Sequence, residues 1–157
     1  MAIKDVSYII KTRDYYRAQG YTTDYLWAQF DTTPFTHLEK PLSESRVGVI
    51  TTTMPDTEAG RVDRRVWSTA SAPIPRSMYT EELSWHKSMT HTDDVASFLP
   101  LAQLNSLQDE GVIGSVASRF HSVPTEYSQR NTLEQDAPEV LARCRQDEVD
   151  IAILVPL

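Results

Sequence analysis

The stretch that decides the fold of this chain reads Val149-Asp150-Ile151-Ala152-Ile153-Leu154-Val155-Pro156-Leu157, a polar start followed by an almost purely apolar run. Short apolar runs that follow a helical segment are typical of strands buried on both faces of a parallel sheet. In open α/β sheets, ligands bind just beyond the carboxyl ends of the strands. Because the chain stops at that point, we expect an active loop that is missing from it or supplied elsewhere.

Two further strands are predicted upstream. Residues 46–53 form a short, β-branched run, and residues 115–119 follow a turn and supply the next strand. The composition of residues 65–68 and 83–86 is also compatible with short strands, within a region that is otherwise rich in loops.

Two helices separate these strands. The first is predicted to begin at Pro100 and to end before Gly111, with leucines at helical spacing between them. The second begins at Thr132, where Gln135 three residues later resembles a capping box, and Pro138 lies in its first turn or kinks it. The order strand, helix, strand, helix, strand predicts a single α/β domain with a mostly parallel sheet flanked by helices.

The N-terminal part, residues 1–45, is predicted to be a helix followed by a packing loop. The helix covers residues 5–19 and stops at Gly20. Residues 21–45 are irregular, but a polar linker would not contain so many large apolar residues. These residues are Tyr25, Leu26, Trp27, Phe30 and Phe35. We therefore expect a loop that packs across the body formed by residues 46–157.

Charge and composition exclude some classes of function. The net charge of -7 and the isoelectric point near 5.0 disfavour nucleic acids and anionic membranes as partners, because both require a basic surface. No apolar run approaches the ~20 residues of a membrane-spanning helix, and the N-terminus lacks a signal-peptide pattern. The single cysteine, Cys144, excludes internal disulfides and fits a reducing compartment. The sequence therefore predicts a cytoplasmic protein.

The densest group of polar side chains consists of His86, His91, Thr92, Asp93 and Asp94. Imidazole and carboxylate groups this close in sequence bind metals or transfer protons. Their spacing, however, matches no standard zinc pattern. Aspartate and threonine side chains in such stretches more often bond to nearby backbone. We therefore favour a polar loop, or a substrate-facing loop without a metal.

His121 precedes a loop that begins Ser122-Val123-Pro124. If the sheet is parallel, His121 lies at the carboxyl edge, where ligands bind. A histidine in this position is as often a surface or capping residue, so the sequence leaves both interpretations open. His37 lies in the predicted packing loop and has no partner in sequence, and no role is assigned to it.

Three other features have structural interpretations that compete with functional ones. Helical spacing with Val140 and Leu141 makes Cys144 a small buried apolar residue, although neighbouring arginines would favour a reactive thiolate. The hydroxyls of residues 51–53 suit a carboxylate or phosphate ligand, or simply reflect strand propensity. Four arginines suit a carboxylate substrate, but we favour a role in balancing surface acids. These are Arg61, Arg64, Arg65 and Arg76.

A series of segments carries a resemblance to a known family. The segments are Ser45-Arg46-Val47-Gly48-Val49-Ile50-Thr51-Thr52, Trp85-His86, Thr90-His91-Thr92-Asp93-Asp94, Ser97-Phe98-Leu99-Pro100-Leu101, Leu104, Glu110-Gly111-Val112-Ile113-Gly114, His121 and Val149-Asp150-Ile151-Ala152-Ile153-Leu154-Val155-Pro156. In order and spacing they resemble the selenoprotein B components of the glycine, sarcosine, betaine and D-proline reductases. The resemblance covers about residues 40 to 157 and is closest to the short, stand-alone members.

The resemblance implies an oxidoreductase subunit that reductively cleaves a small amine or amino-acid substrate. In this family the strand matching residues 149–156 leads into a loop whose cysteine or selenocysteine attacks a substrate carbon and expels an amine or opens a ring. A partner reductase subunit or a thioredoxin-like donor is the implied source of electrons, and no other cofactor and no metal is implied. The residues at matching positions are implied to position substrate or transfer protons at one edge of the sheet. They are His86, His91, Asp93, Asp94 and His121.

The sequence departs from the family pattern at the redox loop. It stops at Leu157, and Cys144 does not match the position of the nucleophile. One hypothesis is that the next codon is UGA, intended for selenocysteine but read as stop, and another is that the protein is shortened. The catalytic role of the family then falls on no residue of this chain, which we expect to be inactive alone. The alternative is a non-catalytic subunit that binds a small molecule or assembles with a partner chain.

Overall fold

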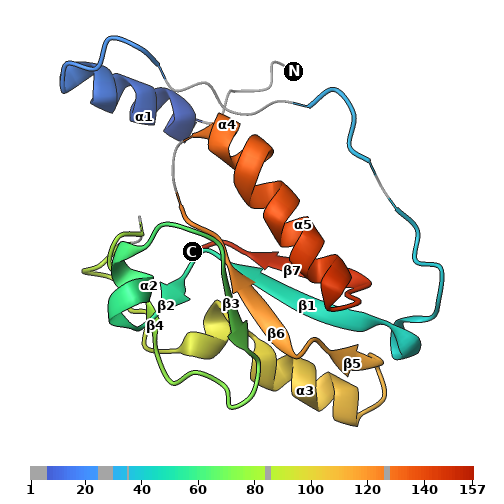
Figure 1. The fold of residues 1–157 in the computed structure, drawn as a ribbon. Coiled ribbons are helices and arrows are strands. Elements are labelled where there is room, and N and C mark those ends of the chain that lie inside the picture. The colour runs from blue at the N-terminus through green and yellow to red at the C-terminus, as the bar shows by residue number, and fades with distance from the viewer. Residues whose placement is uncertain (1–6, 25–29, 35, 84–85, 126–127) are drawn as a thin grey trace. The chain divides into compact units, whose positions relative to one another are not determined.

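The structure is a computed structural model that describes residues 7–24, 30–34, 36–83, 86–125 and 128–157 (Figure 1). The chain divides into two compact units, Met1–Phe35 and Thr36–Leu157, which are described separately. In the described residues, no helix combines the length and the apolar character needed to cross a membrane.

The first unit contains one helix, α1 (Ser7–Ala18), in its described part. The helix ends where Gly20 adopts a left-handed φ of 91° and the Tyr21 N–H donates to the Tyr16 carbonyl over 3.2 Å. The predicted stop at Gly20 is therefore confirmed. Two residues of the predicted packing loop, Tyr21 and Phe30, are exposed. The predicted helix and the predicted packing loop also include residues that lie outside the described ones. They are Asp5, Val6, Tyr25, Leu26, Trp27 and Phe35.

The second unit is built on a mostly parallel sheet. The central strand, β1 (Arg46–Thr51), pairs in parallel with β7 (Ile151–Val155) along one side. Along its other side it pairs in parallel with β5 (Ser115–Val116) and then β6 (Arg119–Ser122). The edge strand β3 (Trp67–Ala70) runs antiparallel to β6. A separate two-stranded antiparallel sheet pairs β2 (Met54–Pro55) with β4 (Met78–Tyr79).

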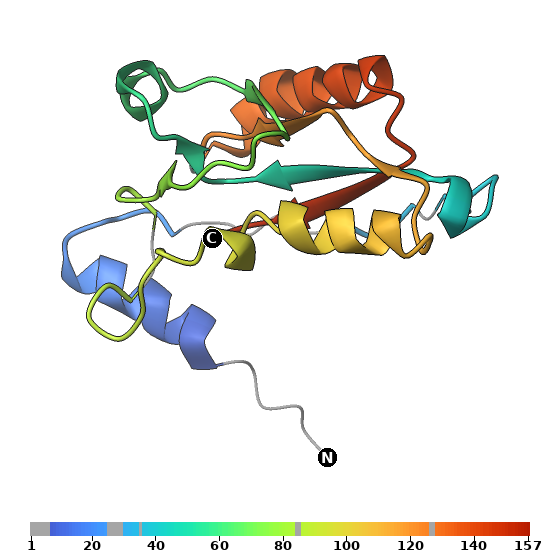
Figure 2. The same cartoon turned by 90° about the horizontal axis from the view of Figure 1, so that it is seen from below.

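Helices cover both faces of the sheet, as Figure 2 shows for α3 (Leu101–Asp109) and α5 (Ala137–Gln146). Under α3 lies the main apolar core, which includes Val47, Val49, Phe98, Leu101, Leu104 and Phe120. Under α5 lies a smaller cluster of Val66, Val140 and Cys144. The remaining helices are short. They are α2 (Glu58–Val62), α4 (Gln129–Asn131), the 3-10 turns Leu42–Glu44 and Val95–Ser97, and a π turn at Thr132–Asp136. The predicted α/β class with a mostly parallel sheet is confirmed.

The prediction that the C-terminal strand is buried on both faces is wrong. In β7 the side chains alternate, with Ile151, Ile153 and Val155 partly buried against the α3 core. The other face is open, and Leu154 is 70% exposed. Among the described residues β7 pairs with β1 alone, and the apolar cluster that contains Val140 and Cys144 of α5 includes no residue of β7.

The predicted capping box at Thr132 is also wrong. The helical segment starts earlier, at Gln129, and the Ser128 hydroxyl caps it by accepting the Asn131 N–H over 3.2 Å. Thr132 therefore lies inside the helical segment, where its hydroxyl donates to the Ser128 carbonyl over 3.1 Å. Pro138 lies in the first turn of α5, as one of the two predicted alternatives required.

Other boundaries shift by a few residues. The first strand ends at Thr51, and Pro100 is the cap preceding α3 and not its first residue. The strand predicted at residues 65–68 is β3, displaced by two residues. Of the strand predicted at residues 83–86, Leu83 lies in a bend and His86 in no strand. Ser84 and Trp85 lie outside the described residues.

Candidate functional site

The carboxyl ends of β1, β6 and β7 meet at one edge of the sheet, because the three strands are parallel. The Leu157 N–H donates to the Thr52 hydroxyl over 2.9 Å, which holds the segment after β7 against the segment after β1. The hydroxyls of Thr51 and Thr53 are buried and bonded to each other over 3.2 Å. Of these three threonines, Thr51 and Thr53 are therefore part of the framework and do not offer their hydroxyls to a ligand.

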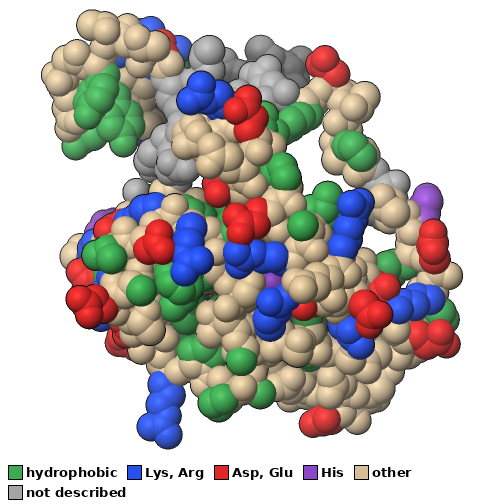
Figure 3. Space-filling view, in the orientation of Figure 1, with side chains coloured by type: hydrophobic (Ala, Val, Ile, Leu, Met, Phe, Trp, Pro, Cys, Tyr) green, Lys and Arg blue, Asp and Glu red, His purple; other side chains and the backbone are tan. Residues whose placement is uncertain are grey.

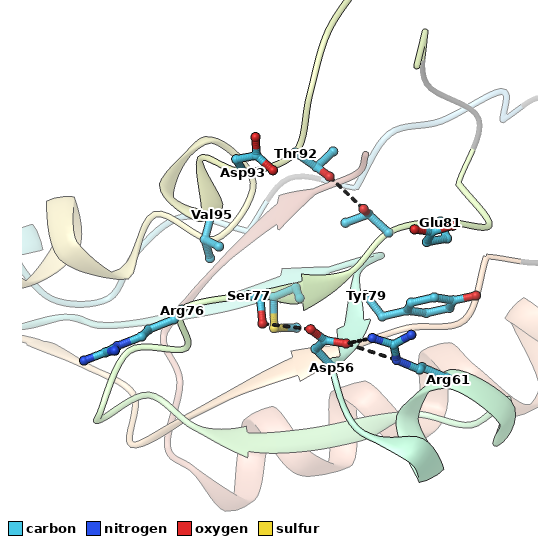
Figure 4. Close-up of a pocket in the computed structure, with 11 residues that line it drawn as sticks. Asp56, Arg61, Arg76, Ser77, Tyr79, Glu81, Thr92, Asp93 and Val95 are labelled. Atoms are coloured by element: carbon cyan, nitrogen blue, oxygen red, sulfur yellow. Dashed lines mark hydrogen bonds and ion pairs between the residues drawn. The ribbon is translucent and has the colours of Figure 1, made fainter. Parts of the chain in front are cut away.

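An open pocket of about 350 Å³ lies on the segments that follow β1 at this edge (Figure 4). Its floor includes Met78 of β4, which belongs to the main apolar core together with the partly buried Val95 and Leu157. Met78 and Val95 of the pocket and Leu157 after β7 thus belong to or pack against the same apolar core. It is lined by Asp56, Arg61, Arg76, Ser77, Met78, Tyr79, Thr80, Glu81, Thr92, Asp93 and Val95.

One side of the pocket is already neutralised. Asp56 accepts the Ser77 hydroxyl over 2.8 Å and the Arg61 guanidinium at 2.5 Å, as the dashed lines in Figure 4 mark. The hydrogen bond from Ser77, followed by that from Arg61, lowers the pKa of the Asp56 carboxyl. The Arg61 guanidinium also lies over the Tyr79 ring, 5.2 Å from its centroid. Asp56, Arg61 and Ser77 thus form one wall of the pocket, and their polar groups bind to one another.

The other lining charges are available to a ligand. Arg76 forms no ion pair or hydrogen bond with another residue in the part of the chain that the structure describes. In Figure 4 its side chain extends away from the Asp56–Arg61 pair. Glu81 and Asp93 add two carboxylates, and the lining hydroxyls of Thr80 and Thr92 lie 2.8 Å apart. The pocket therefore offers a cation and two anions to a small charged molecule.

The residues predicted between 86 and 94 form an exposed polar loop at the pocket. His91 and Asp93 lie together, with 3.6 Å between the imidazole Nδ1 and the carboxylate, and only Asp93 lines the pocket. Asp94 caps the turn Val95–Ser97 by accepting the Ala96 N–H over 3.2 Å. His86 contacts the Ser88 hydroxyl at 3.2 Å. Thr90 and Asp94 bond to local backbone, as the favoured interpretation of a polar loop expects, and Thr92 and Asp93 line the pocket.

His121 is placed differently from these four residues. Its side chain lies under α5 with only 1% of its surface exposed, so it does not line the open edge of the sheet. Its Nδ1 contacts the Ser68 hydroxyl of β3 at 2.9 Å, as the pairing of these two residues across β3 and β6 requires. Its Nε2 lies 3.5 Å from the carboxylate of Asp147, the residue after α5. The polar loop and His121 are therefore two separate groups.

The Ser68, His121 and Asp147 side chains follow the order of a hydrolytic triad, but their geometry does not make one. The Ser68 hydroxyl accepts a hydrogen bond from the Arg143 guanidinium over 2.7 Å, so its oxygen is already engaged. The distance of 3.5 Å between His121 and Asp147 exceeds that of a good hydrogen bond. Substrate cannot reach an imidazole that is almost fully enclosed. The group is a polar contact between the sheet and α5.

Several interpretations from the sequence are settled by local contacts. Cys144 is buried, and burial raises the pKa of its thiol, as expected for an inert cysteine. Arg64 pairs with Glu82, and Arg65 pairs with Asp63 at 2.7 Å, as expected for arginines that balance surface acids. Among the described residues, no group of three or more histidine, cysteine, aspartate or glutamate side chains is suited to hold a metal ion.

Sequence reasoning missed most of the pocket wall. Asp56, Ser77 and Tyr79 belong to no motif that marks them in the sequence. Their contacts join residues that are 21 positions apart in the case of Ser77 and Asp56, so no local motif marks them. Asp147, which pairs with Arg119 over 2.7 Å, was missed for the same reason. Comparison of the chain with protein-family models, with curated proteins and with solved structures finds no match.

Proposed function

We propose that this chain is the substrate-binding part of a selenoprotein B-type reductase, and that it binds a small amine or amino acid whose carbon–nitrogen bond is cleaved reductively. The observation that carries the proposal is the pocket of about 350 Å³ on the segments that follow β1. Ligands of open α/β sheets bind at the carboxyl ends of the strands. This volume lies at the lower end of the usual range for ligand pockets, which suits a molecule of few atoms.

The charged side chains of the pocket suit a ligand that carries both a positive and a negative charge. The Arg76 guanidinium suits a substrate carboxylate, because its planar fork of donors matches two carboxylate oxygens. Asp93 and Glu81 suit a substrate amine, and the hydroxyls of Thr80 and Thr92 add hydrogen-bonding groups. His91 lies 3.6 Å from the Asp93 carboxylate, and a shorter contact in the ligand-bound state would let it transfer a proton there. His86 and Asp94 would shape the loop that carries these side chains.

The position of β7 supports the reductive part of the proposal. In the selenoprotein B family that this chain resembles, the redox nucleophile follows the strand that matches β7. Here Leu157 packs on the core that also contains the pocket residues Met78 and Val95, and its backbone is tied to Thr52. A cysteine or selenocysteine a few residues further on would follow the carboxyl end of β7, at the edge of the sheet where ligands of such folds bind. Its electron pair would form the bond to the substrate carbon, while the amine leaves with the electrons of the broken bond and a proton.

The alternative is a non-catalytic binding or assembly subunit, and the open face of β7 favours it. Leu154 on β7 is 70% exposed, and β7 pairs with only one strand. An apolar edge strand of this kind suits pairing with a partner chain. The two functions differ in one respect, because only the reductase has to turn over its ligand.

Substituting Arg76 is expected to weaken ligand binding. In an Arg76→Gln variant, the dissociation constant for the tightest-binding of glycine, sarcosine, betaine and D-proline should rise about 10- to 100-fold, since a charge-assisted contact is lost. Titration calorimetry measures this change directly. The matched control is Arg130→Gln, because Arg130 is also exposed but lies on α4 and does not line the pocket. Equal affinities of the two variants would contradict the role of Arg76.

The reductase and the binding subunit are distinguished by the gene and by turnover. We expect a UGA or cysteine codon in frame within a few codons after that of Leu157. The full product should then cleave a carbon–nitrogen bond of the ligand in the presence of a dithiol, which supplies the two electrons. Glycine, sarcosine or betaine would release ammonia or an amine, and the ring of D-proline would open. Binding without this cleavage, or a different stop codon with no open frame beyond it, would favour the binding subunit. Absence of binding by all four ligands would contradict the reductase and would leave assembly with a partner chain as the function.

A further inference from the structure

We propose that His121 is an acid-sensitive contact between the sheet and α5. The packing of α5 on β3 and β6 is tight while the imidazole is neutral, and it loosens when the imidazole takes up a proton. The proposal concerns the face of the sheet opposite α3 and is independent of the pocket and its ligand.

The hydrogen bond at Nδ1 of His121 suits the neutral imidazole. The Arg143 guanidinium of α5 donates to the Ser68 hydroxyl over 2.7 Å, which leaves the hydroxyl proton free to be donated to Nδ1 of His121 at 2.9 Å. This chain of donors runs from α5 through β3 to β6 and assigns Nδ1 as an acceptor. The neutral ring then carries its proton on Nε2, which is buried and has no hydrogen-bond partner among the described residues.

A second proton disrupts this arrangement. Protonated Nδ1 becomes a donor, so the Ser68 oxygen would have to accept from both His121 and Arg143 while its own proton loses its acceptor. The added charge would be enclosed, because only 1% of the His121 surface is exposed. An enclosed charge is stable only when opposite charges and hydrogen bonds compensate it fully.

The surrounding charges do not provide that compensation. The arginines of β6 and α5, Arg119 and Arg143, would repel the imidazolium, and Asp147 would attract it. The Asp147 carboxylate, however, already accepts hydrogen bonds from Arg119 at 2.7 and 3.1 Å. The other ionisable groups on this side of the sheet are either paired with a different residue or uncharged. Arg46 of β1 pairs with Glu148 and donates to the Asp147 carbonyl, and Glu139 of α5 pairs with Arg143. Cys144 contributes a buried thiol.

This side of the molecule is highly charged at its surface, as the interleaved acidic and basic side chains of Figure 3 show. The enclosed position of His121 nevertheless decides in which direction its pKa moves. Burial lowers the pKa of His121, Asp147 acts in the opposite direction, and Arg119 and Arg143 add to the lowering.

The sign of the pH dependence follows from this direction. In the unfolded chain the imidazole takes up its proton near the usual histidine pKa of about 6.5. In the folded chain it does so only at lower pH. The stabilisation is therefore complete above about pH 6.5, is lost as the pH falls from there through the lower folded pKa, and changes no further below that. Carboxylates ordinarily titrate at still lower pH, so this range reports on the histidines, among which substitution identifies His121.

Hydrogen exchange tests the proposal on the wild-type chain. Between about pH 7.5 and about pH 5.5, the protection factors of the α5 amides, corrected for intrinsic rates, should fall severalfold and by up to about 10-fold relative to those of α3, since one histidine can contribute no more over this range. The helix α3 is the internal reference because it packs on the opposite face. Equal losses in α3 and α5, or no loss in either, would overturn the proposal.

A substitution then assigns the effect to His121. His121→Asn places an amide near the position of Nδ1 and cannot be protonated in this range, so the loss specific to α5 should disappear. His91→Asn is the matched control, because His91 is 70% exposed and contacts only its own loop, and it should retain the wild-type loss. A loss that persists in a folded His121→Asn variant would overturn the proposal. If that variant does not fold, the wild-type comparison of α3 with α5 decides.

Discussion

Replacing Phe120 with alanine is expected to lower the free energy of unfolding by about 3–5 kcal/mol, the usual range for a fully buried phenylalanine. Phe120 lies on β6 with none of its surface exposed, and it packs in the core between the sheet and α3. The truncation leaves a cavity that the surrounding leucines and Phe98 fill only partly. Urea denaturation followed by circular dichroism measures the loss, which is a large part of the stability of an ordinary domain.

The matched control for Phe120 is the same substitution at Phe30. The Phe30 side chain is 74% exposed, so Phe30→Ala removes little buried area and should change the free energy of unfolding by less than about 0.5 kcal/mol. Similar losses in the two variants would contradict the core described for β6 and α3. A loss below about 1 kcal/mol in Phe120→Ala would do the same.

A second large effect is expected from Gly60→Ala in α2. A Cβ atom at Gly60 would lie 2.2 Å from the Pro55 carbonyl oxygen, a backbone atom that cannot turn away. We expect a loss of about 3 kcal/mol, the upper end of the range for overpacked sites. The higher helix propensity of alanine acts in the opposite direction by about 1 kcal/mol. Because Asp56 and Arg61 flank this contact, the substitution should also weaken ligand binding in the pocket.

Gly48→Ala is the matched control, because Gly48 is also buried but faces a side chain. A Cβ atom there would lie 3.0 Å from a methyl group of Val149, which can shift by a few tenths of an ångström. The expected change in the free energy of unfolding is therefore below about 1 kcal/mol. Thermal and urea denaturation of the two variants give the comparison. Equal stability of Gly60→Ala and the wild type would show that α2 does not pack on the segment after β1.

The fold was predictable where local pattern and tertiary contact agree. The β-branched run at residues 46–51 and the apolar run at 151–155 form parallel strands, and the leucine spacing after Pro100 forms α3. The pattern failed where position in the sheet decides burial. Nothing in the apolar run of β7 indicates that it has a neighbour on one side only, so Leu154 was expected in a core and is exposed instead.

The candidate site was predictable only in part, for a related reason. The polar residues from His86 to Asp94 are close in sequence, and their short contacts are local, so they stand out without a structure. The wall formed by Asp56, Arg61 and Ser77 and the contact between Ser68 and His121 depend on which distant segments pair. His121 shows the limit most clearly, because the direction of its side chain depends on its position in β6 and on α5 above it.

The pairing of β1 with β7 also bears on the order in which the chain folds. Residues 47–51 pair with residues 151–155, so this ladder closes a loop of about 100 residues. The ladder of β1 with β6 closes a shorter one of about 70 residues. Contacts between distant residues slow folding. During translation, β1 therefore emerges long before its partner, and its free edge is open to a chaperone or to another nascent chain until β7 has left the ribosome.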